Sequence, residues 1–205
     1  MVISASPAPR APWQAGHFIG GHPVLDLTNT VFNRSDPVAD NELLKSPTDV
    51  LSWCESAGLS DSAPPLTDAA ARKLVTDVHE VREHAWAVFD AVSRGDALPS
   101  EHFGSLLERA GAGMRADHVP RIDSALDDLV VNWGASGAIP AALSMLAVHA
   151  FFTLPSDRIR ACNRCGWLFL DSSRGGRRRW CSMTTCGNRE KANRHRVSRR
   201  EGFDA

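Results

Sequence analysis

The chain has 205 residues, of which 43% are hydrophobic, and its formal net charge is −1. This length allows one ordinary domain and a small one, and the apolar content argues against a disordered or collagen-like chain. The near-zero charge conceals an asymmetry, because residues 157–205 hold thirteen Lys and Arg against five Asp and Glu, a net +8, whereas residues 1–156 carry −9. A cationic tail on an acidic body is typical of nucleic-acid-binding proteins, and a solvated basic surface is the alternative.

The N-terminal residues 1–13 are rich in Ala, Ser and Pro, and we expect them to form a disordered tail. They lack the charged and apolar regions of a secretory signal. The sequence has no run of about eighteen apolar residues, so no membrane-spanning helix is expected. In the next segment, Gly20 and Gly21 form a turn, and the pattern of 24–31 is compatible with either helix or strand.

A helix start is predicted at 46–49, with Ser46 as the N-cap and Asp49 in the first turn. Gly58 is expected to end this helix. Cys54 lies on its apolar face, so we expect a buried thiol there.

The strongest predicted helix runs from Thr67 to Gly95, and another is expected from Ser100. In the long helix, apolar side chains recur at intervals of four and three residues, which is the period of an amphipathic helix. This stripe consists of Leu74, Val78, Val81, Ala85, Val88 and Val92.

Residues 118–134 have a different, β-prone pattern and predict a small sheet that pairs 118–122 with the apolar run 126–133. An alanine-rich helix is expected from Pro140 to Pro155. Residues 14–155 therefore predict one mainly helical α+β domain. A linker at 155–157 would join it to a C-terminal module at 157–205.

Four of the five cysteines form two close pairs in the C-terminal module, Cys162 with Cys165 and Cys181 with Cys186. Such pairs are typical ligands of a structural Zn²⁺ ion. A disulfide pair and a thioredoxin-like redox motif are alternatives, but the redox motif needs a βαβ unit that the pattern lacks. Because metal binding would supply folding energy, we expect the module to unfold without zinc. Thiolate ligands also indicate a reducing, cytoplasmic location.

The residues between and after the cysteine pairs predict the rest of the finger. Gly166 is expected to close the first turn with a positive φ. The β-prone stretch 167–171, a turn at 172–176 and a returning strand at 177–181 predict a hairpin, and a helix-prone run follows at 187–200. A treble-clef finger consists of a tight turn that carries two ligands, a hairpin and a helix. We call the turn from Cys162 to Gly166 the knuckle. The small core of the finger would consist of Trp167, Phe169 and Trp180.

Nucleic-acid contacts are expected on the helix after Cys186. At about 100° per residue, Arg189, Arg196 and Arg200 fall on one edge of that helix. Arginine and asparagine side chains can reach phosphates and base edges. The candidate contact residues on this helix and the preceding turn are Arg174, Arg177, Arg178, Arg179, Asn188, Arg189, Asn193, Arg196, Arg199 and Arg200. A solvated helix docked on the N-terminal domain is the alternative.

These motifs resemble a known family. The CGNR zinc finger is similar in the strings CNRCGWLF at 162–169, RRWCSM at 178–183 and CGNR at 186–189. The ABATE domain, which precedes that finger, begins in a way similar to GGHPVLDLTNT at 20–30. The resemblance implies a bacterial stress-induced transcription regulator with a ligand-sensing α+β domain and a treble-clef finger that binds DNA. It also implies that the four paired cysteines are the zinc ligands.

Other functions remain open from the residues alone. The finger could bind RNA or a protein instead of DNA. A pocket around His22, Asp26 and Asn29 could be catalytic, because His is the commonest general acid or base. No nucleophile elbow, P-loop or HExxH motif accompanies it, so we do not expect an enzyme.

The same N-terminal cluster, with Gly20 and Gly21, could instead bind a small ligand or make structural hydrogen bonds. One short finger helix offers few base contacts, so useful DNA specificity would need a homodimer or another partner.

Overall fold

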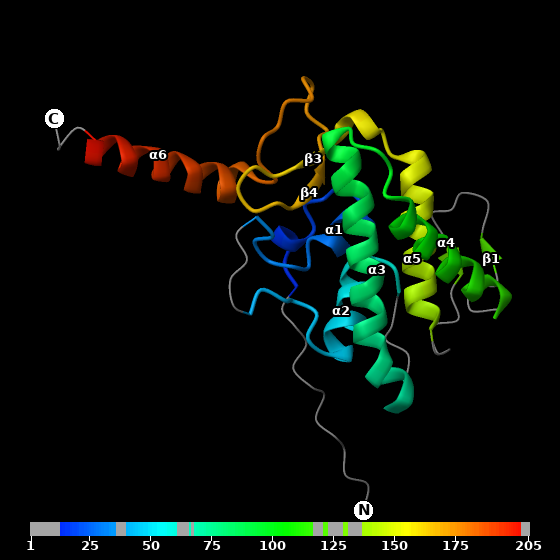
Figure 1. Ribbon diagram of the computed structural model, residues 1–205. Helices are drawn as coiled ribbons and strands as arrows, with labels where there is room; N and C mark the ends of the chain where they lie inside the picture. Colours follow the sequence, from blue (N-terminus) through cyan, green and yellow to red (C-terminus); the bar gives the residue numbers. More distant parts are fainter. Residues whose placement is uncertain are drawn as a thin grey trace, which may run out of the picture.

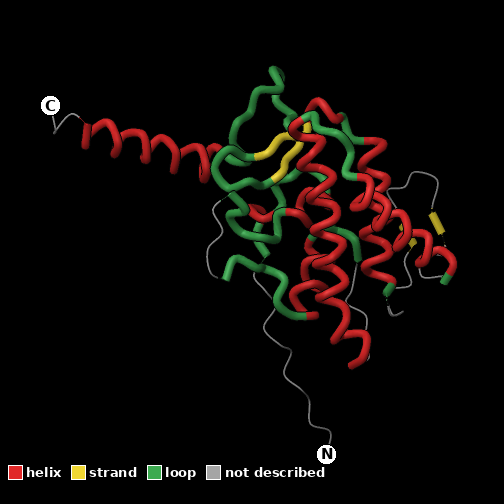
Figure 2. Tube along the Cα trace, in the orientation of Figure 1, coloured by secondary structure: helices red, strands yellow, loops and turns green. Residues whose placement is uncertain are grey.

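The computed structural model describes residues 13–35, 40–60, 66, 68–116, 121–122, 129–130 and 137–201. Helices make up most of the body, and two small antiparallel sheets accompany them (Figure 1 and Figure 2). This architecture confirms the predicted mainly helical α+β body with a C-terminal cysteine module. Across the described ranges, no helix has both the length and the apolar character needed to cross a bilayer.

Helix α1 (Pro23–Thr28) follows the short turn η1 (Ala15–His17) and forms where the sequence left helix and strand open. His22 is its N-cap, and the imidazole Nδ1 accepts a hydrogen bond from the Val24 N–H at 3.2 Å. Pro23 occupies the first helical position, where its missing N–H costs nothing. Five of the six residues of α1 are buried, so this helix lies inside the molecule.

Helix α2 (Pro47–Ser56) begins with the predicted capping box. The Ser46 hydroxyl accepts from the Asp49 N–H at 3.2 Å, and the Asp49 carboxylate accepts from the Ser46 N–H at 2.9 Å. Gly58 follows the helix with a φ of +73°. The predicted buried thiol is also confirmed, because Cys54 is 1% exposed and burial raises its pKa to about 12.

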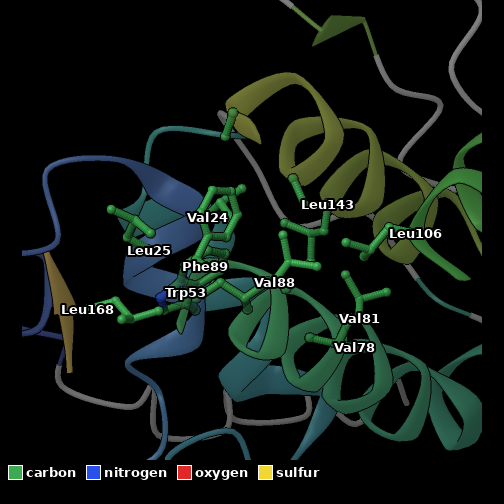
Figure 3. Close-up of a cluster of buried hydrophobic side chains, with 14 of the residues drawn as sticks. Val24, Leu25, Trp53, Val78, Val81, Val88, Phe89, Leu106, Leu143 and Leu168 are labelled. Carbon is green, nitrogen blue, oxygen red and sulfur yellow. The ribbon is translucent and has the colours of Figure 1, made fainter. Parts of the chain in front are cut away.

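Helix α3 (Asp68–Arg94) carries the main core on the stripe that the sequence predicts. Val78, Val81 and Val88 are fully buried. Helices α4 (Ser100–Arg115) and α5 (Ala138–Thr153) pack against α3 and against each other, and Figure 3 shows Leu106 and Leu143 near the valines of α3. The stripe therefore marks the face on which the body assembles.

Strands β1 (Arg121–Ile122) and β2 (Leu129–Val130) pair antiparallel, with Arg121 opposite Val130. This pairing confirms the small sheet predicted within 118–134. The other residues of that stretch lie outside the described part of the chain.

The second sheet corrects the predicted hairpin of the finger. Strand β4 (Leu168–Leu170) pairs with the upstream strand β3 (Ile159–Ala161), and residues 177–181 form no strand. Ile159 lies opposite Leu170 and is 1% exposed. The expected partner stretch begins with three consecutive arginines, which cannot fill the buried side of β4 without burying charge. The short turn η2 (Ser156–Arg158) leads directly into β3.

The hairpin of β3 and β4 is built into the body. Ile159 and Leu168 belong to the same hydrophobic core as α1 and α3. The Asn29 side chain joins α1 to β4, because its Nδ2 donates to the Leu168 carbonyl and its Oδ1 accepts from the Leu168 N–H, both at 2.8 Å. The Leu170 N–H donates to the Gly20 carbonyl at 2.8 Å. The cysteine module therefore rests on a surface shaped by residues 20–29.

Replacement of Asn29 tests this contact. Asn29→Ala leaves the N–H and carbonyl of the fully buried Leu168 without their partners. We expect the free energy of unfolding to fall by roughly 2–6 kcal/mol, since each of the two unpaired buried groups costs about 1–3 kcal/mol. Urea denaturation of the zinc-loaded protein measures this loss.

Asn163→Ala is the matched control, because Asn163 is exposed on the same module. It should change stability by no more than about 0.5 kcal/mol. Equal stability of the two variants would show that the Asn29 bonds do not hold β4.

Candidate metal centre and nucleic-acid interface

The four paired cysteines lie together at the base of the finger. The sulfurs of Cys162, Cys165, Cys181 and Cys186 are buried and all lie within 4.8 Å of one another. The Cys165–Cys181 and Cys165–Cys186 sulfur distances are 3.6 Å, and the Cys181–Cys186 distance is 3.7 Å. Four sulfurs about 2.3 Å from a central Zn²⁺ would be about 3.8 Å apart, so the cluster fits a tetrahedral zinc site.

The disulfide alternative does not fit these distances. A disulfide needs sulfurs about 2.05 Å apart, and the structure leaves every cysteine unpaired. Four thiolates also complete the zinc coordination shell and leave no open position for a substrate. The centre is therefore structural.

The knuckle forms in the connection between β3 and β4. The Cys162 N–H donates to the Trp167 carbonyl at 2.8 Å, and the Gly166 N–H donates to the Cys162 carbonyl at 2.9 Å. Gly166 has the predicted positive φ, +73°. A Cβ at this position would lie 2.8 Å from the Ser35 hydroxyl oxygen and 3.1 Å from the Arg34 Cβ. Glycine is thus required both by the turn and by the N-terminal segment packed on it.

Cys181 precedes η3 (Met183–Gly187), a single π-helical turn that contains Cys186 and leads into α6 (Asn188–Glu201). The Gly187 N–H donates to the Ser182 carbonyl at 3.0 Å. A Cβ on Gly187 would lie 2.8 Å from the Met183 sulfur and 3.3 Å from the Trp180 ring. The close packing of this turn places Cys186 beside Cys181 and fixes where α6 starts.

The sulfurs affect one another's protonation. The Cys162 sulfur and burial raise the pKa of Cys165 to about 12, and contacts to Cys162 and Cys165 raise the pKa of Cys181. Hydrogen bonds from Cys165 and Cys181 lower the pKa of Cys162. The contacts among these three sulfurs therefore favour a thiolate at Cys162 and thiols at Cys165 and Cys181. A bound dication supplies the charge that the other thiolates need.

Aromatic side chains cover the centre as the sequence predicts. Phe169 is fully buried, Trp167 is 7% exposed, and Trp180 packs against them from the side. Ile19 completes this cluster from the N-terminal segment. The metal centre therefore has a small core of its own beside the main one.

The arginine-rich turn after β4 is organised by Asp171. Its carboxylate accepts from the Ser173 N–H at 2.9 Å and from the Arg178 N–H at 2.8 Å. Burial raises the pKa of Asp171, but these hydrogen bonds and one from the Ser173 hydroxyl outweigh it and hold the pKa at about 2. The carboxylate is thus ionised and fixes the loop that carries the arginines.

The structure divides the candidate contact residues. Arg178 faces inward, because its Nη2 donates to the Cys181 carbonyl at 2.7 Å and its guanidinium lies over the Phe169 ring. The exposed members are Arg174, Arg177, Arg179, Asn188, Arg189, Asn193 and Arg196. Arg199 and Arg200 belong to α6, but their side chains are outside the described part of the structure.

The N-terminal candidate ligand residues make structural hydrogen bonds. The Asp26 carboxylate accepts from the Gly20 N–H at 2.7 Å, His22 caps α1, and Asn29 binds β4. Gly21 has a φ of +79° and lies against Leu170. Burial raises the pKa of Asp26 to about 6, although the Gly20 N–H opposes the shift.

Sequence reasoning missed an ion-pair network that supports the same region. The Arg82 guanidinium binds both Glu42 carboxylate oxygens at 2.7 Å, and Arg34 binds both oxygens of Glu83. Arg34 also donates to the Thr28 carbonyl at 2.9 Å, at the end of α1. The paired residues lie 40 and 49 positions apart, so no local spacing could have revealed them.

A mainly helical α+β domain that carries a buried four-cysteine centre defines a zinc-finger protein. The family model "ABATE: Putative stress-induced transcription regulator" matches residues 21–157, and the CGNR zinc finger matches residues 158–200. Because the first match alone covers more than half of the chain, this protein belongs to the ABATE family and carries a CGNR finger. Neither a curated protein nor a solved structure matches the chain.

The raised pKa of Asp26 predicts a pH-dependent stability. The folded state holds the Asp26 proton up to about pH 6, whereas its ordinary pKa is 3.8, so stability is lost as the pH rises between these values. Asp26→Asn keeps an acceptor for the Gly20 N–H but cannot ionise. Relative to the native protein, the variant should gain about 1 kcal/mol between about pH 5 and pH 7, and nothing further above that. Chemical denaturation across this range measures the difference, and a constant difference would contradict the assignment.

Proposed function

We propose that this protein is a transcription regulator that binds DNA through its zinc finger, with α6 as the principal contact element. The observation that carries the proposal is the placement of α6. Figure 1 shows this helix extending from the finger away from the rest of the molecule. It packs against η3 at its start, and its described side chains beyond Glu190 are exposed.

The dimensions and charge of α6 suit the major groove of DNA. Fourteen helical residues span about 21 Å, and the major groove admits an α-helix. Arg189 and Arg196 are exposed and fall on one edge of the helix. A helix docked on the N-terminal domain, the alternative considered from sequence, would not project from the body.

The finger loop adds further positive charge. Arg174, Arg177 and Arg179 are exposed on the turn held by Asp171. Fixed arginines of this kind suit phosphate contacts, which set affinity and register without reading sequence. This arrangement supports separate roles, with phosphate contacts from the loop and base-edge contacts from the helix.

The order of the finger's parts supports a treble-clef assignment. A knuckle with two ligands comes first, and the other two ligands immediately precede a long helix. The same centre could bind RNA or a protein, but the described aromatic rings of the finger are packed around the metal or against arginine. DNA is therefore the better-supported partner, because single-stranded RNA is recognised largely through exposed aromatic rings.

The rest of the proposal concerns the N-terminal domain. We assign it a sensing role without catalysis, because His22, Asp26 and Asn29 are engaged in structural hydrogen bonds. We place the protein in the cytoplasm, where thiolates stay reduced. A homodimer would supply a second α6 to read a second DNA half-site.

Removal of arginines from the exposed edge of α6 tests DNA binding. Arg189→Ala with Arg196→Ala should lower the affinity for random-sequence duplex DNA and reduce the slope of log K against log salt by about one unit for each arginine. Fluorescence anisotropy between about 50 and 200 mM salt measures both quantities.

Arg72→Ala is the control, because it removes a positive charge from an exposed position on α3, and it is compared with each of the two single α6 variants. It should leave affinity and slope nearly unchanged. Absence of binding by the native protein at the lowest salt, or identical behaviour of all these proteins, would count against DNA as the partner.

A further inference from the structure

A cavity lies between the N-terminal segments and the finger. Its volume is about 580 Å³, within the range of small-molecule sites. Three of the metal-binding cysteines form part of its wall: Cys165, Cys181 and Cys186. The cavity is much larger than a metal ion, so it extends from the metal centre into the space between these segments. None of the five N-terminal residues that sequence suggested for ligand binding lines it.

One side of the cavity is apolar and aromatic. Phe32, which is 44% exposed, and Trp167 are aromatic residues that line this cavity. The Trp167 Nε1 donates to the Val31 carbonyl at 2.8 Å, so the indole presents its carbon surface rather than a free donor. Leu43 and Ile19 extend the apolar wall.

The other side is cationic. Arg164 from the knuckle and Arg189 from the start of α6 line the cavity, and no Asp or Glu is among the described residues that form its wall. The cysteine thiolates on the metal side are negative, and a bound Zn²⁺ offsets two of their four charges. Arg164 forms an ion pair with Glu190 at 3.5 Å, which is the outer limit of a hydrogen bond. A guanidinium has five N–H donors, so it can bind an anion while keeping this contact.

The walls are held in place without a ligand. The Ser35 N–H donates to the Cys165 carbonyl at 3.3 Å, which joins the N-terminal segment to the knuckle. The Trp167–Val31 bond makes a second connection nearby. In Figure 1 the blue N-terminal segment accordingly lies next to the finger. A preformed site loses less free energy to ordering when it binds a ligand.

We propose that this cavity binds a small aromatic anion, whose ring lies on Phe32 and Trp167 and whose charged group binds Arg164 and Arg189. The inference rests on the proposed regulator and names the ligand class and the site of its sensing domain. Arg189 is also a proposed DNA contact. Ligand and DNA would therefore compete for it, and each would weaken binding of the other by the same factor.

Two fluorescent probes that differ by one anionic group test the proposed ligand site. The test uses no DNA, so a negative result for the ligand site would leave the DNA proposal intact. The probes are 1-anilinonaphthalene-8-sulfonate and its uncharged counterpart, N-phenyl-1-naphthylamine. Zinc-loaded protein should bind one molecule of the sulfonate probe per chain. Its affinity for this probe should be about tenfold higher than its affinity for the neutral probe. Equal affinities, or several equivalent sites per chain, would overturn the proposal.

Variants then locate the site. Arg164→Gln should abolish the preference for the sulfonate, whereas Arg177→Gln, at an exposed arginine outside the cavity, should preserve it. Phe32→Ala should weaken both probes, and Phe152→Ala, at a ring 71% exposed elsewhere, should weaken neither. Zinc content and far-UV circular dichroism check folding.

Ile19→Trp narrows the cavity and should exclude both probes. Unchanged binding of the probes in Arg164→Gln or in Ile19→Trp would show that the dye binds elsewhere.

Discussion

The two hydrogen bonds between the Asn29 side chain and the backbone of Leu168 determine how the molecule is organised. They join residues 139 positions apart, one at the end of α1 and one in the strand that follows the zinc knuckle. The Asn29 side-chain amide donates to and accepts from the same residue of β4, so it pairs with the edge of this strand as a neighbouring strand would. The buried polar backbone of β4 is thereby satisfied by the N-terminal domain. The finger is consequently part of the body rather than a module on a flexible linker.

This arrangement couples the metal centre to the main core. The knuckle lies at the turn between β3 and β4, and the same hairpin contributes Ile159 and Leu168 to the core beneath α3. On the opposite side, Gly166 allows the 34–35 segment to pack against the knuckle. The metal stabilises a hairpin that the body needs, and the body supplies the surface on which the hairpin folds. Among the described elements, α6 extends beyond this shared structure, and it carries the proposed base-edge contacts.

Local signals in the sequence predicted local structure well. The Ser46–Asp49 capping box, the apolar stripe of α3 and the spacing of the cysteines each depend on neighbours a few residues away. The partner of β4 was predicted wrongly, because the turn at 172–176 indicated a returning strand at 177–181 but not that its three arginines would have to be buried. The choice of β3 depends instead on a core position for Ile159 that only the folded structure defines.

The sequence alone could not distinguish the possible roles of His22, Asp26 and Asn29, because these roles too depend on contacts that only the folded structure defines. A histidine, an aspartate and an asparagine beside two glycines are equally suited to catalysis, ligand binding and capping. Their hydrogen-bond partners, Gly20, Val24 and Leu168, decide among these roles. The cavity beside the knuckle was likewise beyond sequence reasoning, because its walls come from several separate segments.

Hydrogen exchange measured by mass spectrometry, on the protein with zinc bound and after its removal, tests the coupling between metal centre and body most directly. The structure predicts that zinc removal lowers protection in the finger, at 159–187, and also in α1 at 23–28, with α4 at 100–115 affected least. Loss of protection confined to the finger, with α1 unchanged, would contradict the conclusion that the two parts form one unit.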